Sequence, residues 1–235
     1  MKKSTLATLI VLFVLIPLTL YLGTILPGRS YYITGTLIVI WLLIPFFLSF
    51  EGRKPQAREL VTIAVMCVLA VVGRAAIPIH NFKAIFAIIM LSGIAFGPET
   101  GFMVGAISAF ASNFFYGQGP YTPWQMLGYG VAGLLAGFLF AKGRLPRKPL
   151  LLAVFGFVGV VLIVGPVLDT STVFLTLPEI SWATVWPIYT SGFTVNVSQG
   201  ICTALVLLLL GRPLLDKLDR LKVKYGMMEA HGDGV

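Results

Sequence analysis

Hydrophobic runs of about 20 residues follow one another along almost the whole chain, and they constrain its fold more than any other feature. An α-helix needs about 20 apolar residues to cross a bilayer. The mean hydropathy is +0.94 and only 11% of the residues are charged, as is typical of membrane proteins. The sequence therefore predicts an all-α integral membrane protein.

These runs predict eight spans, at residues 5–26, 32–50, 59–77, 82–97, 99–115, 123–141, 149–168 and 188–211. Gly97-Pro98-Glu99-Thr100 predicts a tight turn that joins the fourth and fifth spans into a helical hairpin. The first run, which follows two lysines, also resembles a signal peptide. Because its apolar part is too long and no Ala-x-Ala site follows, a retained span is expected.

The cations are distributed unevenly over the loops between these spans. The chain carries 17 lysines and arginines against 9 acids, a formal charge of +8. With the N-terminus inside, only Arg29, Arg74 and Lys83 fall near the outer side, and the other cations fall inside. This positive-inside pattern predicts a cell-membrane protein with both termini cytoplasmic. A nucleic-acid partner is not expected, because these cations sit in short loops and form no exposed basic face.

Two boundaries, the charged connector at residues 51–59 and Arg212-Pro213, divide the chain into three predicted parts. Residues 1–50 form an accessory transmembrane hairpin, residues 56–212 a six-helix membrane domain, and residues 213–235 a cytoplasmic segment and tail. The cytoplasmic segment places its leucines on one helical face, which predicts an amphipathic helix at the inner membrane surface or on a cytoplasmic partner; they are Leu214, Leu215, Leu218 and Leu221. The last residues, 229–235, are expected to be disordered.

Small residues recur at helical spacing along three spans. Four-residue spacing relates Gly101, Gly105 and Ala109 in the fifth span, and Gly128, Ala132 and Ala136 in the sixth. Such faces let helix backbones approach closely, so internal packing is expected there. Ala64, Cys67 and Ala70 form a third stripe, which meets either the chain's own helices or another subunit. Cys67 and Cys202 lie in apolar runs and are expected to be packing residues.

Residues 113–125 interrupt the apolar sequence with a short polar and aromatic loop. Amides and amphipathic aromatics in such a loop suit a small polar organic molecule, although an ordinary external turn with interfacial aromatics has the same composition. Its side chains include Asn113, Tyr116, Gln118, Tyr121, Trp124 and Gln125. Thr122-Pro123-Trp124-Gln125 reads as a capping box at the start of the sixth span.

Other polar residues lie at the predicted outer ends of the spans. Asn81 and Lys83, next to His80, precede the fourth span, and Asn196 and Gln199 share one face of the eighth. A buried amide needs partners, so this pair serves either helix packing or a site. Residues 169–189 are expected to form a long outer loop, either a lid or a reentrant element, that carries Trp182, Trp186 and Tyr189.

Several motifs are missing from the sequence. It contains no phosphate loop, no His/Cys metal cluster and no nucleophile elbow, so neither catalytic residues nor a metal or cofactor are expected. No Asp or Glu falls inside a predicted span, which argues against proton-coupled transport. If the protein moves a solute uphill, the energy is expected to come from another subunit.

The stretches Ala64–Arg74, Gly97–Gly101 and Asn113–Gln125 together resemble the substrate-binding S components of energy-coupling factor (ECF) vitamin transporters. The resemblance implies a six-helix bundle that binds a vitamin at the external face, here preceded by two additional helices. It also implies a coupling transmembrane subunit and two ABC-type ATPases as partners, with delivery of the vitamin by reorientation in the bilayer.

The resemblance also implies roles for particular residues. The stripe Ala64, Cys67 and Ala70 would face the coupling subunit. Cobalamin is the expected vitamin, because an open aromatic site suits a bulky corrinoid, and riboflavin or another flat ring would also fit. The implied substrate-binding residues are Asn81, Lys83, Asn113, Tyr116, Gln118, Tyr121, Trp124, Gln125, Trp186, Tyr189, Asn196 and Gln199.

Two functions from other classes remain open. An autonomous channel or facilitator would need more polar residues along the spans to line a pore. An intramembrane enzyme acting on lipid would need an acid, a base or a nucleophile grouped at one interface, and His80 is the only histidine in the membrane region.

Overall fold

The computed structural model describes residues 10–25, 30–52, 57–77, 79 and 81–224, and within these ranges the chain is helical throughout, with short turns and no strand. The all-α prediction is therefore confirmed, whereas the count of six helices plus two stays a prediction. The predicted disordered tail, residues 229–235, and His80 lie outside the described residues.

The helices follow the predicted spans closely in the first two thirds of the chain. They are η1 (Val11–Leu15), α2 (Ile16–Ile25), α3 (Ser30–Gly52), α4 (Ala57–Ala75), α5 (Ile85–Phe96), α6 (Pro98–Tyr116) and α7 (Thr122–Phe140). The hairpin turn between α5 and α6 is confirmed: Gly97 has φ 102°, a conformation that favours glycine, and Pro98 opens α6.

The last third departs from prediction. The seventh span continues as α8 (Pro149–Gly159), the π-helical turn η2 (Val160–Val164) and α9 (Gly165–Thr176), and α10 (Trp182–Lys224) begins six residues before the predicted span. The predicted long loop at 169–189 is therefore wrong. A π-helical turn loosens the backbone just before Pro166, and this lets the helix continue past a residue that has no N–H donor.

Three helical stretches of the described chain are long and apolar enough to cross a membrane by length and composition. They are Thr122–Phe140, Pro149–Thr176 and Trp182–Lys224, with Ile33–Leu48 and Ile85–Phe96 as shorter apolar helices. These helices support a multi-pass membrane protein.

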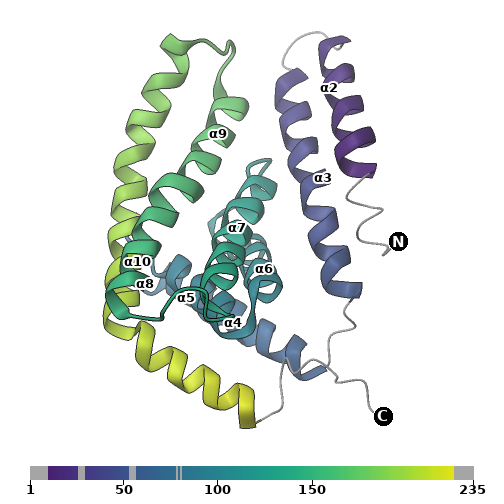
Figure 1. The fold of residues 1–235 in the computed structure, drawn as a ribbon. Coiled ribbons are helices and arrows are strands. Elements are labelled where there is room, and N and C mark those ends of the chain that lie inside the picture. Colours follow the sequence, from purple (N-terminus) through teal and green to yellow (C-terminus); the bar gives the residue numbers. More distant parts are fainter. Residues whose placement is uncertain (1–9, 26–29, 53–56, 78, 80, 225–235) are drawn as a thin grey trace.

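Helix α5 lies at the centre of the bundle, and every residue in it except Ile88 is buried. The pair α9–α10 stands on one side of α7 and the hairpin α2–α3 on the other, while α4 runs across the lower part at a steep angle (Figure 1). The hairpin packs on the bundle partly through α3, where the Phe46 ring stacks on Phe102 of α6 at 4.0 Å.

Glycines allow α6 and α7 to approach closely. A Cβ atom added to Gly101 would collide with the carbonyl of Gly133, and one added to Gly105 would collide with that of Tyr129. The prediction that the small residues of α6 serve internal packing is confirmed. The α7 residues opposite them are Tyr129 and Gly133, beside the predicted stripe of Gly128, Ala132 and Ala136.

The small-residue stripe of α4 also faces the chain's own core. Cys67 and Ala70 are buried, and the Cys67 thiol lies 3.7 Å from the Val104 carbonyl of α6. Ala64 alone of the three is exposed. The exposed face of α4 instead carries aliphatic residues, including Val61, Val65, Val68 and Val72.

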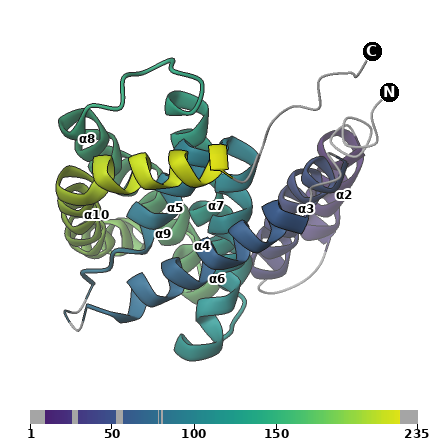
Figure 2. The same ribbon diagram turned by 90° about the horizontal axis from the view of Figure 1, so that it is seen from below.

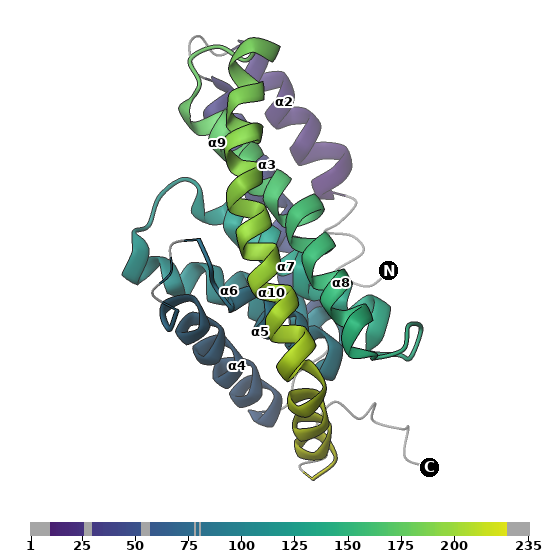
Figure 3. The ribbon, with the colours of Figure 1, turned by 90° about the vertical axis from the view of Figure 1, so that its left-hand side faces the viewer.

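Helix α10 runs through Pro213 without interruption and bends toward its C-terminal end (Figure 3). Leu215 is fully buried, and Leu214 and Leu218 pack on the same core, whereas Leu221 is exposed. The amphipathic pattern therefore docks this segment mainly on its own chain. Seen from below, the segment crosses the ends of α5 and α7 (Figure 2).

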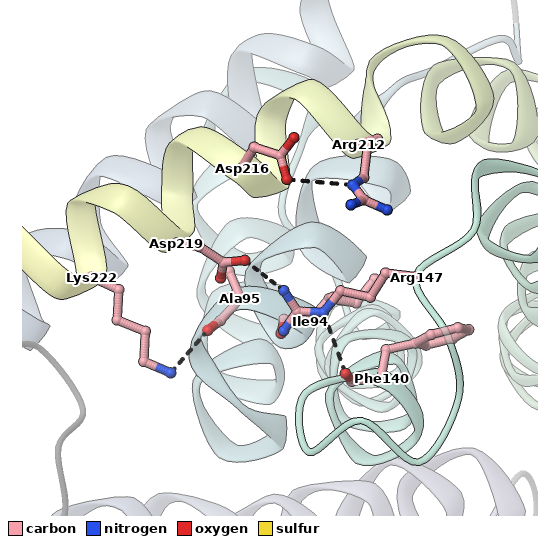
Figure 4. A network of polar contacts seen from close by, with 8 residues as sticks. All are labelled: Ile94, Ala95, Phe140, Arg147, Arg212, Asp216, Asp219 and Lys222. Atoms are coloured by element: carbon pink, nitrogen blue, oxygen red, sulfur yellow. Dashed lines mark hydrogen bonds and ion pairs between the residues drawn. The ribbon is translucent and has the colours of Figure 1, made fainter.

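Polar contacts hold this crossing in place (Figure 4). Arg147, in the loop before α8, pairs with Asp219 of α10 at 2.7 Å and donates to the Ile94 carbonyl at 3.0 Å. Lys222 lies 3.4 Å from the Ala95 carbonyl. Ile94 and Ala95 lie in the last turn of α5, where the helix dipole is negative and favours cations. We use the name α5 clasp for Arg147, Asp219 and Lys222 with the Ile94 and Ala95 carbonyls.

Candidate functional site

An amide network fixes the loop between α6 and α7. Asn113 donates to the Thr122 hydroxyl at 3.1 Å and to the Gln125 side-chain oxygen at 2.8 Å. The Thr122 hydroxyl donates in turn to Gln118 at 2.9 Å. We use the name amide network for Asn113, Gln118, Thr122 and Gln125. Asn113, Gln118 and Gln125 were predicted site residues, and here they bond one another through Thr122 or directly, so the network orders the loop as it stands.

Arg74 of α4 binds this network through hydrogen bonds to α6, and we call its contacts the Arg74 clamp. Its guanidinium donates to the Asn113 oxygen at 3.0 Å and to the Ser112 hydroxyl, and it lies 4.5 Å over the Tyr116 ring. The Tyr116 hydroxyl donates back to the Arg74 carbonyl at 3.3 Å. The sequence had suggested only an outer location for Arg74, and its structural role was missed.

The predicted capping box at the start of α7 is wrong. The N-cap residue is Tyr121, with no side-chain cap hydrogen bond, and Thr122 is already helical. Thr122 and Gln125 instead bond Asn113, because that buried amide, 1% exposed, offers two donors. Tyr121 donates to the Gly117 carbonyl at 2.7 Å, within the same loop.

Trp124 is a packing residue in this structure. It is 8% exposed and stacks on Phe174 of α9 with ring centroids 5.7 Å apart. Its ring also lies against Gly35 of α3. Trp124 of α7 therefore contacts both α3 and α9.

Two further predicted residues precede α5. Lys83 donates to the Ile77 carbonyl at 2.8 Å, and Asn81 adopts a left-handed turn conformation with φ 57°. Asparagine tolerates this conformation better than most residues. Both side chains are half-buried in the turn.

A pocket of about 500 Å³ lies along the α9–α10 pair, and we call it the α9–α10 pocket. Val161 and Leu162 of the π-helical turn form part of its wall. The remaining lining residues are Pro166, Asp169, Trp186, Tyr189, Thr190, Phe193 and Asn196. Its size lies in the range of pockets that hold drug-sized organic molecules.

Asp169 and Asn196 form the polar part of this pocket. Asp169 is 9% exposed and Asn196 is 6% exposed. The Asn196 amide donates to the Asp169 carboxylate at 2.8 Å. At the next residue of α9, the Thr170 hydroxyl lies 2.6 Å from the Tyr189 hydroxyl of α10. Hydrogen bonds therefore tie the two helices together beside the cavity.

The expectation that no span holds a buried acid is wrong, because Asp169 lies inside the continuous helix Pro149–Thr176. The error followed from ending the seventh span at residue 168. Four-residue spacing of Gly165 and Asp169 on one helix, and of Gly192 and Asn196 on the next, was the signal available in the sequence.

The predicted site residues thus fall into separate groups. Trp186, Tyr189 and Asn196 come together in the α9–α10 pocket. Asn113, Gln118 and Gln125 come together in the amide network, with Tyr116 at the Arg74 clamp. Gln199 is half-buried on α10, outside the residues that line the pocket.

Taken together, an apolar helical bundle and an aromatic pocket with one buried carboxylate describe a polytopic membrane protein with a cavity of the size that holds small organic molecules. Residues 54–216 match the family model of the ECF-type riboflavin transporter, S component. Because the match covers more than half of the chain, this chain belongs to that family. It is a family of transporter components, not of enzymes.

One curated relative matches part of the chain. A UPF0397 protein of Vibrio atlanticus (strain LGP32) is 29% identical over 120 residues, which are 48% of this chain. The chain thus spans 65% of the length of that relative. No solved structure matches the chain. Helices α2 and α3 lie outside the family match.

Proposed function

We propose that this chain is the substrate-binding subunit of an ATP-driven vitamin uptake transporter, and that the α9–α10 pocket holds the vitamin. The observation that carries the proposal is the aromatic pocket of about 500 Å³ in a chain of the S-component family. Trp186 and Phe193 are 65% and 54% exposed, so their rings are accessible to a ligand.

The ligand we propose is a flat-ring vitamin of the size of riboflavin. Aromatic walls favour a planar ring by stacking, and the matching family model is that of a riboflavin transporter component. Cobalamin, expected from the sequence, finds no support in the comparisons. A corrinoid is also much larger than the molecules that pockets of this volume enclose.

The outer loop has a supporting role in this proposal. Asn113, Gln118 and Gln125 hold the α6–α7 loop in shape, while the exposed Tyr116 and Gln118 are the members of that region best placed to meet a ligand. Asn81, Lys83 and Tyr121 shape neighbouring turns, and Gln199 lies three residues after Asn196 on α10.

The partners we propose are a coupling transmembrane subunit and two ABC-type ATPases. The sequence contains no phosphate loop of its own, so ATP hydrolysis belongs to other chains. The exposed face of α4, with Ala64 among its valines, is the surface we assign to the coupling subunit. We also propose that both termini lie in the cytoplasm, because the uneven distribution of the cations over the loops favours this orientation.

A binding assay on the detergent-purified protein tests the proposal. Mass spectrometry of the co-purified ligand and titration with riboflavin should both report a bound flat-ring vitamin, and cobalamin should not compete. Trp186→Ala should weaken binding by about ten- to a hundredfold through the loss of one aromatic contact. Binding of cobalamin in place of riboflavin would contradict the assignment of the ligand.

A further inference from the structure

The α9–α10 pocket contains the carboxylate of Asp169, and few neighbouring groups balance its charge or donate hydrogen bonds to it. Asp169 receives one hydrogen bond, from Asn196, and no lysine or arginine of the described residues forms an ion pair with it. A carboxylate has about four lone-pair sites. Ionisable groups inside membrane spans are costly, and they mark functional sites by default. A ligand in the pocket is therefore the natural source of further donors.

Asp169 and Asn196 together offer a ligand a hydrogen-bond acceptor and a hydrogen-bond donor side by side. Because an ionised carboxylate only accepts hydrogen bonds, the Asn196 nitrogen must face Asp169. That nitrogen carries two hydrogens and gives one of them to Asp169 at 2.8 Å. Asp169 thus remains an acceptor, and Asn196 keeps a second donor next to it.

The geometry points to Asp169 and Asn196 as a two-point recognition site for a ring edge that carries an N–H donor beside a carbonyl, as in a cyclic imide. This inference rests on the proposed function and names the chemistry of its ligand. The ring N–H donates to Asp169, and the neighbouring carbonyl accepts from Asn196. Trp186, Tyr189 and Phe193 contact the faces of the ring.

The helices hold the pair in a fixed position, as recognition requires. Asp169 of α9 lies directly against Gly192 of α10, and Asn196 of α10 lies directly against Gly165 of α9, so each side chain is packed tightly on the opposite helix. The π-helical turn at Val160–Val164 lies beside the same pocket, and such turns are frequent at functional sites. Both residues of the pair also line the pocket, so this packing fixes their positions at its wall.

The experiment compares riboflavin, whose ring has an imide edge, with 3-methylriboflavin, which has a methyl group in place of that N–H. Both are titrated into the purified full-length protein while flavin fluorescence is followed. The native protein should bind the methylated flavin about ten- to a hundredfold more weakly, the effect of losing one hydrogen bond to a charged group.

Variants then test whether Asp169 is responsible for the preference for riboflavin over 3-methylriboflavin. Asp169→Asn keeps the shape of the side chain and should weaken riboflavin binding by a similar factor while removing most of the preference between the two flavins. Asp216→Asn removes an exposed carboxylate elsewhere on α10 and should change neither affinity. If Asp169→Asn fails to fold, the two flavins and the native protein still test the inference.

The outcomes separate this inference from the proposed function. Tight riboflavin binding without discrimination between the flavins, or with discrimination that survives Asp169→Asn, overturns the inference and leaves the flat-ring proposal intact. Preference for a cationic vitamin, with thiamine as the probe, assigns Asp169 to charge recognition and overturns the imide edge. Failure to bind any flavin overturns both.

Discussion

The Asn196 amide nitrogen of α10 lies 2.8 Å from the Asp169 carboxylate of α9, and each side chain packs against a glycine of the opposite helix. Asp169 covers Gly192 and Asn196 covers Gly165, so the contact is reciprocal. Two glycines and two polar side chains thereby join the helices that line the pocket. The absence of a Cβ atom at both glycines is what makes room for the hydrogen bond.

Replacing Gly192 by alanine should therefore destabilise the protein and distort the pocket. A Cβ atom there would collide with the Asp169 carboxylate. Overpacking of this kind costs about 1–3 kcal/mol. Thermal unfolding of the purified protein should show the loss, and ligand affinity should fall with it.

Gly211→Ala is the matched control on the same helix. The nearest atom to its added Cβ lies at 3.6 Å, an ordinary contact. Alanine is favoured over glycine in a helix interior by about 0.5–1 kcal/mol, so stability should be unchanged or slightly higher. Equal destabilisation by both substitutions would show that the Asp169–Gly192 contact is unimportant.

Trp124→Ala should lower the stability of the empty protein, although its position in the polar and aromatic loop first suggested a ligand contact. The ring fills space between Gly35 and Phe174. Emptying a buried site of this size typically costs about 3–5 kcal/mol. Trp182→Ala, at a tryptophan that is 86% exposed, should have little effect on the same melting curve.

Asn113→Ala should loosen the loop between α6 and α7. The buried amide serves Arg74, Thr122 and Gln125, and its removal leaves their polar atoms with fewer partners. Each buried group left unsatisfied costs about 1–3 kcal/mol. Faster hydrogen exchange at residues 117–121 should report the change. Unchanged exchange there would mean that the amide network does not order the loop.

At the α5 clasp, Arg147→Ala should cost more stability than Asp219→Ala. Asp219 is 43% exposed and makes one ion pair, which is worth less than about 1 kcal/mol when solvent screens it. Arg147 also donates to the Ile94 carbonyl at the end of α5. A comparison of the two melting temperatures checks this order, and the reverse order would contradict the role given to Arg147.

The sequence predicted the helices well where hydrophobic length alone decides the outcome. Helices α4 to α7 begin and end within a few residues of the predicted spans, and the turn at Gly97 follows from glycine and proline chemistry. The end of α9 was missed because polar residues from Asp169 onward look like a loop. Their hydrogen-bond partners on α10 are close only in the folded chain.

The candidate site was predicted only in part for the same reason. Trp186, Tyr189 and Asn196 were found because amphipathic aromatics and a buried amide stand out in an apolar sequence. Asp169 was not predicted as a site residue, because its place in the pocket depends on which helix packs against it in the folded chain. Thr122 and Gln125 satisfied a local capping pattern, but a tertiary contact with Asn113 determines their actual hydrogen bonds.

Asp169 also bears on the source of energy for transport. The sequence argued against proton coupling because no acid lay in a predicted span, and that argument no longer holds. A proton-driven carrier is therefore the alternative that a transport assay must exclude.

Uptake of labelled riboflavin into proteoliposomes provides the most direct test of the central claim that this chain binds a vitamin but depends on other subunits for energy. The chain alone should bind riboflavin and show no uphill accumulation, with either ATP or a proton gradient. Addition of the coupling subunit and the two ATPases should produce ATP-dependent accumulation. Accumulation by the chain alone, driven by a proton gradient, would contradict this account.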